Sequence, residues 1–489
     1  MLFVRLVRAV WVFGLIFNSY VFWLMVRKIF RRWRKDEQGR DVPRDPGWVH
    51  AYKSRIDRLN ARRLLHGMLR LRGVYIKLGQ VLSIMGGFLP RVYAKELESL
   101  QDAVPPRPFS ELRPVFQETL GKAPEELYES IEEEPLAAAS LGQVHRAVER
   151  GTGRELAVKV LYPGIRGVIR TDMRVVRLAI RAYELFVPVQ GIERVHSSLV
   201  DLLKRETDYT HEAACMTRMA ANFADEEDIL FPEVVEGASS TDVLTMTFME
   251  GFKITSFEAM EEAGVDREAV AKRLVQSFYK QLFVDRFFHA DPHPGNFLVQ
   301  AGPRADAPRI VVLDFGAISE VKQGMVDGMV DVLRGFFEGR DDLVLEGIEE
   351  IGFVAPDGDR ALLEQTVKTY FQKLLKVERT AGAIMRATEE ELGELADPEV
   401  QRNELRQLMR SVVYPEGWFY VERASVLMFW LVGQIAPDLD TLSVGFPYVL
   451  PLLAERTQKA AAEAAEAAKA SDDARGEADV EASPPVAPA

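Results

Sequence analysis

The sequence predicts an α+β protein in which a strand-rich segment lies between helical segments. Two strand-like runs, 137–145 and 155–161, flank a glycine-bearing turn at 149–153, which is the pattern of a β-hairpin. An apolar, β-branched run at 243–249 predicts a further strand. Before and after these strands, apolar residues recur at steps of three and four, so we expect helices on both sides.

Length and composition narrow the class of protein. The chain has 489 residues, of which 47% are hydrophobic, and this is enough for a large core and more than one domain. The formal net charge of -13 argues against a general nucleic-acid binder, so we expect no nucleic-acid partner. Cys215 is the only cysteine; no intramolecular disulfide can form, which suits a reducing compartment.

Residues 1–36 predict a membrane-associated or membrane-spanning helix. The run 9–26 carries no charge, and its length only just reaches the minimum for a span. More basic residues follow this run than precede it, which would keep the downstream side cytoplasmic. Three interpretations stay open: a span, a helix lying in the interface against anionic headgroups, or a core helix of a soluble domain. The first two place the protein at a membrane.

Residues 37–134 predict a helical region that begins with a polar linker at 39–47. Five apolar residues of this region fall at steps of three and four and so share one helix face: Leu64, Met68, Leu71, Tyr75 and Leu78. The run Lys77-Leu78-Gly79-Gln80 overlaps the end of this pattern. On physical grounds alone, Lys77 and Gln80 are solvent-exposed helix residues.

Two loops near the centre of the chain carry the residue types of a metal–triphosphate site. The spacing from Asp291 to Asn296 matches H-x-D-x-x-x-x-N, the kinase catalytic loop, in which the Asp orients the attacking group and the Asn holds a metal ion. The apolar run 309–313 predicts a buried strand, and it leads into an Asp-Phe-Gly tripeptide that begins at Asp314. In kinases that Asp holds Mg²⁺, which prefers such hard oxygen ligands. Together the loops predict a kinase-type site for Mg²⁺ and ATP (or ADP).

Lys159 lies in the second strand of the predicted hairpin. Its run L-A-V-K resembles the kinase strand whose lysine meets the α/β-phosphates. Burying a strand lysine without a carboxylate partner costs free energy, so a buried Lys159 would need such a partner. The alternative is that Lys159 lies in an edge strand and faces water. The helical run 195–224 offers Glu206 and Glu212, which point about 120° apart in a continuous helix and should therefore serve different partners. Two alanines follow Glu212 and allow close packing.

The remaining pattern completes a five-part organisation. Helical periodicity returns at about 266–286 and continues, after Asp314, to about 453. The Ala/Glu-rich and then Pro/Ala-rich end of the chain, from residue 460, predicts a frayed helix and a disordered tail. The predicted parts are the membrane helix at 1–36, a helical extension at 37–134, a strand-rich lobe at 135–250, a helical lobe at 251–455 and a tail at 456–489.

The order of these elements resembles the UbiB/AarF family of atypical protein-kinase-like proteins, over about residues 63–453. The distinguishing K-x-G-Q motif of that family is matched by Lys77, Gly79 and Gln80. Its E-x-D motif is matched by Glu206 and Asp208. Its alanine-rich loop, which replaces the kinase glycine loop, is matched by Ala137, Ala138, Ala139 and Ser140.

The nucleotide-site residues of the family also have counterparts here. Its lysine–glutamate ion pair would be Lys159 with Glu212. Its catalytic aspartate is matched by Asp291, and its two metal ligands by Asn296 and Asp314. The resemblance therefore implies that Lys159, held by Glu212, orients the α/β-phosphates of ATP, and that Asp291 positions the attacking group.

The resemblance implies a bilobal kinase-like fold with the N-terminal helical extension packed over the active site. There Lys77 would meet Glu206 and Asp208 and gate the groove in which a protein kinase holds its peptide. Alanine also restricts backbone conformations that glycine permits. Both features argue against protein phosphorylation in trans. Family members associate with membranes and support ubiquinone or other isoprenoid-lipid metabolism.

Three function classes follow. The first is a Mg²⁺-ATP-dependent kinase or ATPase whose partners are anionic membrane lipids and isoprenoid or quinone intermediates, or the enzymes that make them. The second is a nucleotide-gated, non-catalytic scaffold for a lipid-biosynthetic complex, against which the intact Lys159, Asp291 and Asp314 count. The third is an aminoglycoside-type small-molecule phosphotransferase, against which the alanine loop and the K-x-G-Q run count. The sequence leaves the oligomeric state open.

Overall fold

The computed structural model describes residues 2–35, 41–71, 73–76, 78–79, 91–97, 106–184, 192–354 and 415–481. Helices and strands both occur, as the α+β prediction requires. The chain forms two compact units: the first comprises Met1–Gly251 with Val311–Ala317, and the second comprises Phe252–Ile310 with Ile318–Ala489. The short segment that carries Asp314 therefore belongs to the first unit, although its neighbours in sequence on both sides belong to the second.

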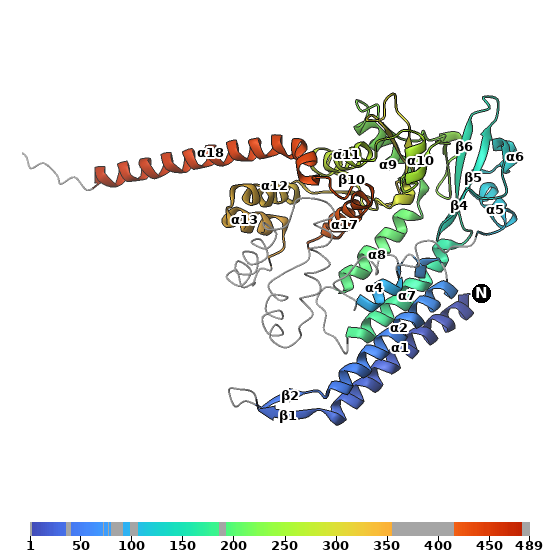
Figure 1. Ribbon diagram of the computed structural model, residues 1–489, viewed down its shortest axis with the longest axis horizontal. Helices are drawn as coiled ribbons and strands as arrows, with labels where there is room; N and C mark the ends of the chain where they lie inside the picture. The colour runs from blue at the N-terminus through green and yellow to red at the C-terminus, as the bar shows by residue number, and fades with distance from the viewer. Residues whose placement is uncertain are drawn as a thin grey trace, which may run out of the picture. The chain divides into compact units, whose positions relative to one another are not determined.

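The first unit begins with two long helices, α1 (Leu2–Phe30) and α2 (Gly47–Leu71), which lie side by side (Figure 1). Between them, β1 (Arg32–Lys35) and β2 (Asp41–Arg44) pair antiparallel. β1 lies at the end of the segment 1–36 predicted as a helix, and β2 lies in the predicted polar linker. Within the described residues, α1 is the one helix long and apolar enough to cross a membrane. Only 6% of its most apolar window is buried, so the interpretation of α1 as a core helix is wrong.

The predicted apolar face of the helical extension is buried. Each of Leu64, Met68, Leu71, Tyr75 and Leu78 is at most 7% exposed. Gly67 of α2 lies so close to α1 that a Cβ there would approach the Val12 side chain to 2.6 Å. Among the described residues before the sheet, the short helices α4 (Arg91–Leu97), α5 (Phe109–Leu120) and α6 (Pro124–Leu127) follow.

A five-stranded antiparallel sheet follows in the first unit. Its strands are, in order, β3 (Tyr128–Ile131), β5 (Gly142–Glu149), β6 (Glu155–Leu161) and β8 (Val243–Thr247), with β4 (Ala137–Ala138) also paired to β5. The predicted hairpin is confirmed as β5–β6. The register places Lys159 of β6 between Val144 of β5 and Leu244 of β8. Lys159 therefore lies in an interior strand, which excludes the edge-strand alternative.

The helical run predicted at 195–224 is two helices rather than one. After α7 (Ile165–Glu184), α8 (Ile192–Glu206) ends where Thr207 and Asp208 interrupt the helix, and α9 (Tyr209–Asn222) begins. Asp208 has extended backbone angles, φ -127° and ψ 92°, and its side chain caps α9. Glu206 and Glu212 thus lie on different helices, and the angle expected from one continuous helix does not apply. The short strand β7 (Ile229–Leu230) follows.

The second unit places the Asp291 loop between short strands. β9 (Phe252–Lys253) pairs with β11 (Phe297–Gln300), and β10 (Phe287–His289) pairs with β13 (Ile318–Glu320), both antiparallel. The chain reaches β10 through α10 (Phe257–Glu262), α11 (Arg267–Tyr279) and a π-helical turn (Lys280–Val284), which confirms the helical pattern at 266–286. β12 (Arg309–Val312), buried after its first residue, confirms the strand before Asp314.

After β13, the described residues of the second unit are mainly helical, as predicted. They form α12 (Gln323–Glu338), α13 (Asp341–Ile351), α17 (Trp418–Ile435) and α18 (Thr441–Glu481). α18 continues to Glu481, so the helix expected from residue 460 is longer, and the disordered tail expected at 456–489 shorter, than predicted. Alanine and glutamate are strong helix formers, so this composition favours a helix. Residues 482–489 lie outside the described part of the chain.

Candidate active site

Lys159 projects from β6 toward two carboxylates of the first unit. Its Nζ donates to Glu212 Oε1, and it lies 3.5 Å from Asp314 Oδ2. The structure thus brings together three of the residues that the sequence singled out, from a strand, a helix and the Asp-Phe-Gly segment.

Glu212 is the most buried member of this group. Its side chain is 3% exposed, against 13% for Lys159 and 42% for Asp314. Besides the Lys159 ammonium group, Glu212 Oε1 accepts a hydrogen bond from the backbone N–H of Phe315, at 3.3 Å. A buried carboxylate needs such partners, and here one is a cation and the other is an amide. Glu212 therefore joins the strand lysine to the Asp-Phe-Gly segment.

Neighbouring carboxylates keep the Lys159 ammonium group protonated. Burial alone would lower the pKa of its ammonium group, but the carboxylates of Asp314 and Glu212 outweigh burial and raise that pKa. The Tyr209 ring, with its centroid 5.6 Å from Nζ, adds a cation–π contact. Burial raises the pKa of the Tyr209 hydroxyl, which is therefore neutral at physiological pH. Lys159 carries a full positive charge there and suits phosphate oxygens.

The Asp-Phe-Gly segment is held in a fixed turn. Asp314 Oδ1 accepts from the N–H of Gly316 at 2.9 Å. Phe315 is fully buried and its ring centroid lies 5.9 Å from that of Phe231. A Cβ on Gly316 would lie 3.3 Å from Asp314 Oδ1 and 3.7 Å from Glu206 Cγ. Glu206 of the E-x-D motif thus lies beside this segment.

The alanine-rich run forms a tight strand pair rather than an open loop. Ala137 and Ala138 pair with β5, and the N–H of Ala139 donates to the Gly142 carbonyl at 2.8 Å. A Cβ on Gly142 would lie 2.4 Å from the Val160 carbonyl oxygen and 2.9 Å from the Tyr209 hydroxyl. Only glycine fits there. Nucleotide contacts from residues 137–140 stay a prediction.

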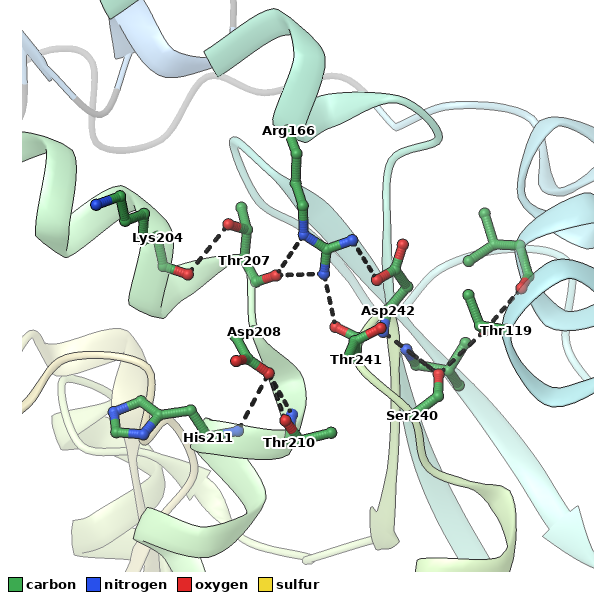
Figure 2. Close-up of polar contacts among 12 residues, drawn as sticks. Thr119, Arg166, Lys204, Thr207, Asp208, Thr210, His211, Ser240, Thr241 and Asp242 are labelled. Carbon is green, nitrogen blue, oxygen red and sulfur yellow. Dashed lines mark hydrogen bonds and ion pairs between the residues drawn. The ribbon is translucent and has the colours of Figure 1, made fainter. Parts of the chain in front are cut away.

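Asp208 of the E-x-D motif caps helix α9. Its Oδ1 accepts from the backbone N–H of Thr210 at 3.1 Å and of His211 at 3.3 Å, and from the Thr210 hydroxyl at 2.5 Å (Figure 2). Burial alone would raise the pKa of Asp208, but these hydrogen bonds lower it. Asp208 therefore starts the helix that carries Glu212, and its contact with Lys77 stays a prediction.

Arg166 of α7 holds the break between α8 and α9. Its guanidinium donates to the Thr207 carbonyl at 2.6 and 3.1 Å and to the Thr241 carbonyl at 3.2 Å, and it pairs with Asp242 at 2.6 Å (Figure 2). Sequence reasoning missed Arg166. It lies in an ordinary helix about 40 residues before the motif, and no local pattern sets it apart from other helix arginines.

The helical extension touches the alanine-rich run. A Cβ on Gly73, which has φ +59°, would lie 3.8 Å from the Ser140 carbonyl oxygen. Gly79 of the K-x-G-Q motif is buried. Lys77 and Gln80 lie outside the described residues, so their gating role stays a prediction.

In the second unit, the Asp291 loop is organised by its own backbone. The N–H of Asp291 donates to His289 Nδ1 at 3.1 Å. The Asp291 carbonyl accepts from the N–H of His293 at 2.7 Å and from Asn296 Nδ2 at 3.0 Å. Asn296 therefore uses its amide nitrogen to close the loop, and its amide oxygen is the atom that suits a metal ion.

Arg423 of α17 is a second residue that the sequence did not reveal. Its Nη2 lies 2.6 Å from Asp291 Oδ2, and its side chain is 3% exposed. Asp291 and Arg423 are far apart in sequence. The available signal was an arginine inside the strongly apolar run of α17, which is costly to bury without a partner.

The metal-binding candidates fit Mg²⁺. Asp314 in the first unit and Asn296 in the second each offer one hard oxygen. Among the described residues, no three His, Cys, Asp or Glu side chains form a cluster that could hold a metal ion. Mg²⁺ prefers such oxygen ligands and is commonly held by one or two protein groups together with water and substrate phosphates; metal binding by Asp314 and Asn296 stays a prediction.

The fold, the lysine–glutamate pair and the aspartate loop define an atypical kinase-like protein. The chain belongs to the ABC1 atypical kinase-like domain family, whose match covers residues 99–347. It is 30% identical, over 398 residues, to a protein of Marinobacter nauticus named probable protein kinase UbiB, and this match covers 79% of the chain and 69% of the relative. The predicted family resemblance is confirmed.

Further similarities agree with this assignment. The chain is 30% identical, over 452 residues, to the chloroplastic protein ACTIVITY OF BC1 COMPLEX KINASE 8 of Arabidopsis thaliana, covering 88% of this chain and 58% of that protein. The fold resembles Rv3197 of Mycobacterium tuberculosis, solved with erythromycin, with a TM-score of 0.51 and 24% identity, covering 81% of this chain and 97% of that one. The predicted kinase-like fold with N-terminal helices is confirmed. The chain spans 54–65% of the length of the first three curated relatives.

Proposed function

We propose that this protein binds Mg²⁺-ATP at a membrane surface and acts as an atypical kinase or ATPase in ubiquinone or other isoprenoid-lipid metabolism. The observation that carries the proposal is the group formed by Lys159, Glu212 and Asp314. It combines a fixed cation with an exposed carboxylate, which are the charges that a metal–triphosphate requires. Membership of the ABC1 family and the named UbiB relatives support the kinase-like activity and the lipid pathway.

Each residue has a defined task in this proposal. Bound Mg²⁺-ATP supplies the phosphoryl group and neutralises charge as that group is transferred. Lys159, held by Glu212, orients the phosphates, while Asp314 and Asn296 offer oxygens to the metal. Asp291 orients the attacking water or hydroxyl group. Such positioning accounts for most of the catalysis in phosphoryl transfer.

The exposed face of α1 supports the membrane location. Large apolar residues lie along one side at alternating steps of four and three: Trp11, Leu15, Phe22, Met25 and Ile29, from 39% to 73% exposed. Asn18 falls on the same side and turns its amide back to the Gly14 carbonyl at 2.9 Å. The helix has no acidic residue, and Arg8 and Lys28 near its ends are exposed. An apolar stripe with basic ends suits an anionic bilayer surface.

The polar contacts of α1 favour a helix that lies in the interface over one that spans the bilayer. Near its middle, the Tyr20 hydroxyl donates to Asp57 at 2.6 Å and Ser19 accepts from Asn60 at 2.6 Å, both on α2. Near its start, Arg5 pairs with Asp172 of α7 at 2.6 Å. α2 and α7 carry many charged residues, so neither can enter the hydrocarbon core beside α1.

ATP hydrolysis with and without vesicles tests the activity. The full chain would be assayed alone and with liposomes that contain anionic lipid and a quinone precursor. We expect lipid-stimulated turnover that Asp314→Ala abolishes. Asp306→Ala is the matched control, because Asp306 pairs only with exposed Arg304 in the described residues. If ATP binds but no lipid condition gives turnover, a nucleotide-gated scaffold replaces the proposed enzyme.

Vesicle co-sedimentation tests the membrane contact separately. The double variant Trp11→Glu/Phe22→Glu should lose binding to anionic vesicles, because it places two carboxylates on the apolar stripe. Leu178→Glu, at a position 63% exposed on α7, should bind as the wild type does. Equal binding by all three proteins would refute the assignment of this face.

A further inference from the structure

Arg423 is a buried cation whose hydrogen-bonding capacity is only partly used. Its side chain is 3% exposed, and its Nη2 pairs with Asp291 Oδ2 at 2.6 Å. In the part of the chain that the structure describes, neither Nε nor Nη1 has a hydrogen-bond partner, and both atoms are buried. A guanidinium stays protonated in proteins, so these are donors on a full charge.

Such donors are costly to leave without acceptors. An unsatisfied buried donor costs about 1–3 kcal/mol, and a charged one costs more. Arg456 of α18, in the same unit, gives the contrast. Its guanidinium contacts three carboxylates, those of Asp327, Asp331 and Glu350. Within the described residues, Arg423 pairs with one carboxylate, that of Asp291.

The position of Arg423 indicates which acceptor would satisfy it. The guanidinium lies against the carboxylate that, in the proposed function, orients the attacking group. Asp291 is the more exposed member of the pair, at 16% against 3% for Arg423. A compact anion with several oxygens can accept from separate N–H groups of one guanidinium, and phosphate has this form.

We infer that Arg423 binds a phosphate oxyanion through Nε and Nη1 and thereby stabilises the phosphoryl group that is transferred beside Asp291. The inference rests on the proposed function. In that reaction the bond from the terminal phosphorus to the bridging oxygen of ATP breaks. The bond from that phosphorus to the attacking oxygen forms, and the proton of the attacking group passes to the Asp291 carboxylate. Arg423 forms no covalent bond and stays charged throughout.

Thermal-shift measurements on the full chain test this assignment. The protein would be melted with Mg²⁺-ADP, with Mg²⁺-ADP and aluminium fluoride, which mimics a phosphoryl group in transfer, and with inorganic phosphate alone. We expect the wild type to gain an additional shift from fluoride beyond that from ADP. Arg423→Gln should keep the ADP shift and lose the fluoride increment. Arg423→Lys should keep part of it, because the charge remains without the planar set of donors.

Arg456→Gln is the matched control, since it removes the same charge from a fully paired arginine of the same unit and should keep both shifts. Turnover gives a second readout: Arg423→Gln should lower kcat about 10²–10³-fold, the size expected for one stabilising donor group, with little change in the KM for ATP. A purely structural role would instead lower every shift together with the melting temperature.

The outcomes separate the inference from the proposed function. An equal fluoride increment in the wild type and in Arg423→Gln would overturn the inference, and so would no increment in a wild type that responds to ADP. No ADP shift in the wild type would refute nucleotide binding itself, and the inference falls with it. If inorganic phosphate alone stabilises the wild type but not Arg423→Gln, and the fluoride increments are equal, the site holds a separate phosphate and the phosphoryl assignment is overturned.

Folding of the variant has its own control. If Arg423→Gln does not fold, Arg423→Lys answers the same question, because it keeps a positive charge beside Asp291 and removes the planar set of donors. It should retain the ADP shift and show a smaller fluoride increment than the wild type. A fluoride increment of wild-type size in Arg423→Lys would contradict the inference.

Discussion

The Lys159–Glu212 pair of the first unit and the Arg423–Asp291 pair of the second each contain a kinase-type motif residue. The two pairs differ in which partner is the more buried and in how many of the hydrogen bonds of that partner are formed. In the first unit the buried partner is the anion: Glu212 accepts from Lys159 and from the Phe315 N–H. In the second unit the buried partner is the cation: Arg423 reaches Asp291, while its Nε and Nη1 have no partner in the described residues.

The difference separates two uses of a buried charge. A charge whose hydrogen bonds are complete gains little by changing partners, so Glu212 is suited to hold Lys159 in one place. A charge with unused donors has free energy to gain from a ligand, so Arg423 is suited to recognition. Four predictions test this contrast, beginning with the largest expected effect.

Removal of the two buried partners should have unequal effects on stability. Glu212→Ala leaves Lys159 with only Asp314 at 3.5 Å and leaves the Phe315 N–H without its acceptor, so the free energy of unfolding should fall by about 3–5 kcal/mol. Arg423→Gln removes donors that are already unsatisfied and should cost about 1–2 kcal/mol. Urea denaturation measures both values, and a larger loss for Arg423→Gln would reverse the comparison.

The first pair can also be disturbed without changing either charge. Gly142→Ala forces a methyl group against the Val160 carbonyl and the Tyr209 hydroxyl, whose ring lies over Lys159. We expect a loss of about 1–3 kcal/mol in the free energy of unfolding. Gly167→Ala is the control: nothing lies within 4 Å of its Cβ position in α7, so it should stabilise by up to about 1 kcal/mol. Equal effects of the two substitutions would refute the close packing.

The cap of α9 should have a smaller, pH-dependent effect. Asp208→Ala should cost about 1 kcal/mol at neutral pH, because it leaves the Thr210 and His211 N–H groups without their acceptor. The pKa of Asp208 is lowered in the folded state, so its contribution is present above the unfolded pKa of about 3.9 and is lost as pH falls through the folded pKa. Unfolding free energies at pH 7 and pH 3 measure the change; an undiminished difference at pH 3 would contradict it.

The smallest expected effect on stability comes from His145, a buried imidazole that stays neutral in the folded protein. His145 is fully buried; its Nδ1 donates to the Glu132 carbonyl at 2.7 Å, and its Nε2 accepts from Gln143 at 2.9 Å. Burial lowers its pKa, so the unfolded chain takes up the proton first as pH falls below about 6.5. Stability should therefore decrease with falling pH in that window. His145→Gln should show a flatter pH dependence between pH 7 and 5, and an identical slope would exclude His145 as its source.

Sequence reasoning found the features that are encoded by residues close together in the sequence. The β5–β6 hairpin follows from its turn glycines, and Lys159, Asp291, Asn296 and Asp314 stand at fixed spacings in short motifs. Glu212 was identified through the family resemblance. Its alanine neighbours gave only a general reason for close packing.

The features that it missed depend on contacts between distant segments. Asp208 is a good N-cap by type, yet the helical periodicity on both sides concealed the break between α8 and α9. Arg166 and Arg423 acquire their roles from carbonyls and a carboxylate that the fold brings to them. No spacing rule encodes such partners. The extent of α18 was underestimated because a composition typical of disorder is also one of high helix propensity.

The assignment of Val311–Ala317 to the first unit has a consequence for dissecting the molecule. A polypeptide that ends at Gly251 lacks Asp314, the Phe315 ring that packs near Phe231, and the amide that Glu212 needs. Truncation at that boundary would remove the ring that packs near Phe231 and would leave the Glu212 carboxylate without the hydrogen bond from the Phe315 N–H. The first unit is thus completed by a segment that lies about 60 residues downstream in the sequence, and a peptide of this segment could be supplied in trans to complement the truncated chain.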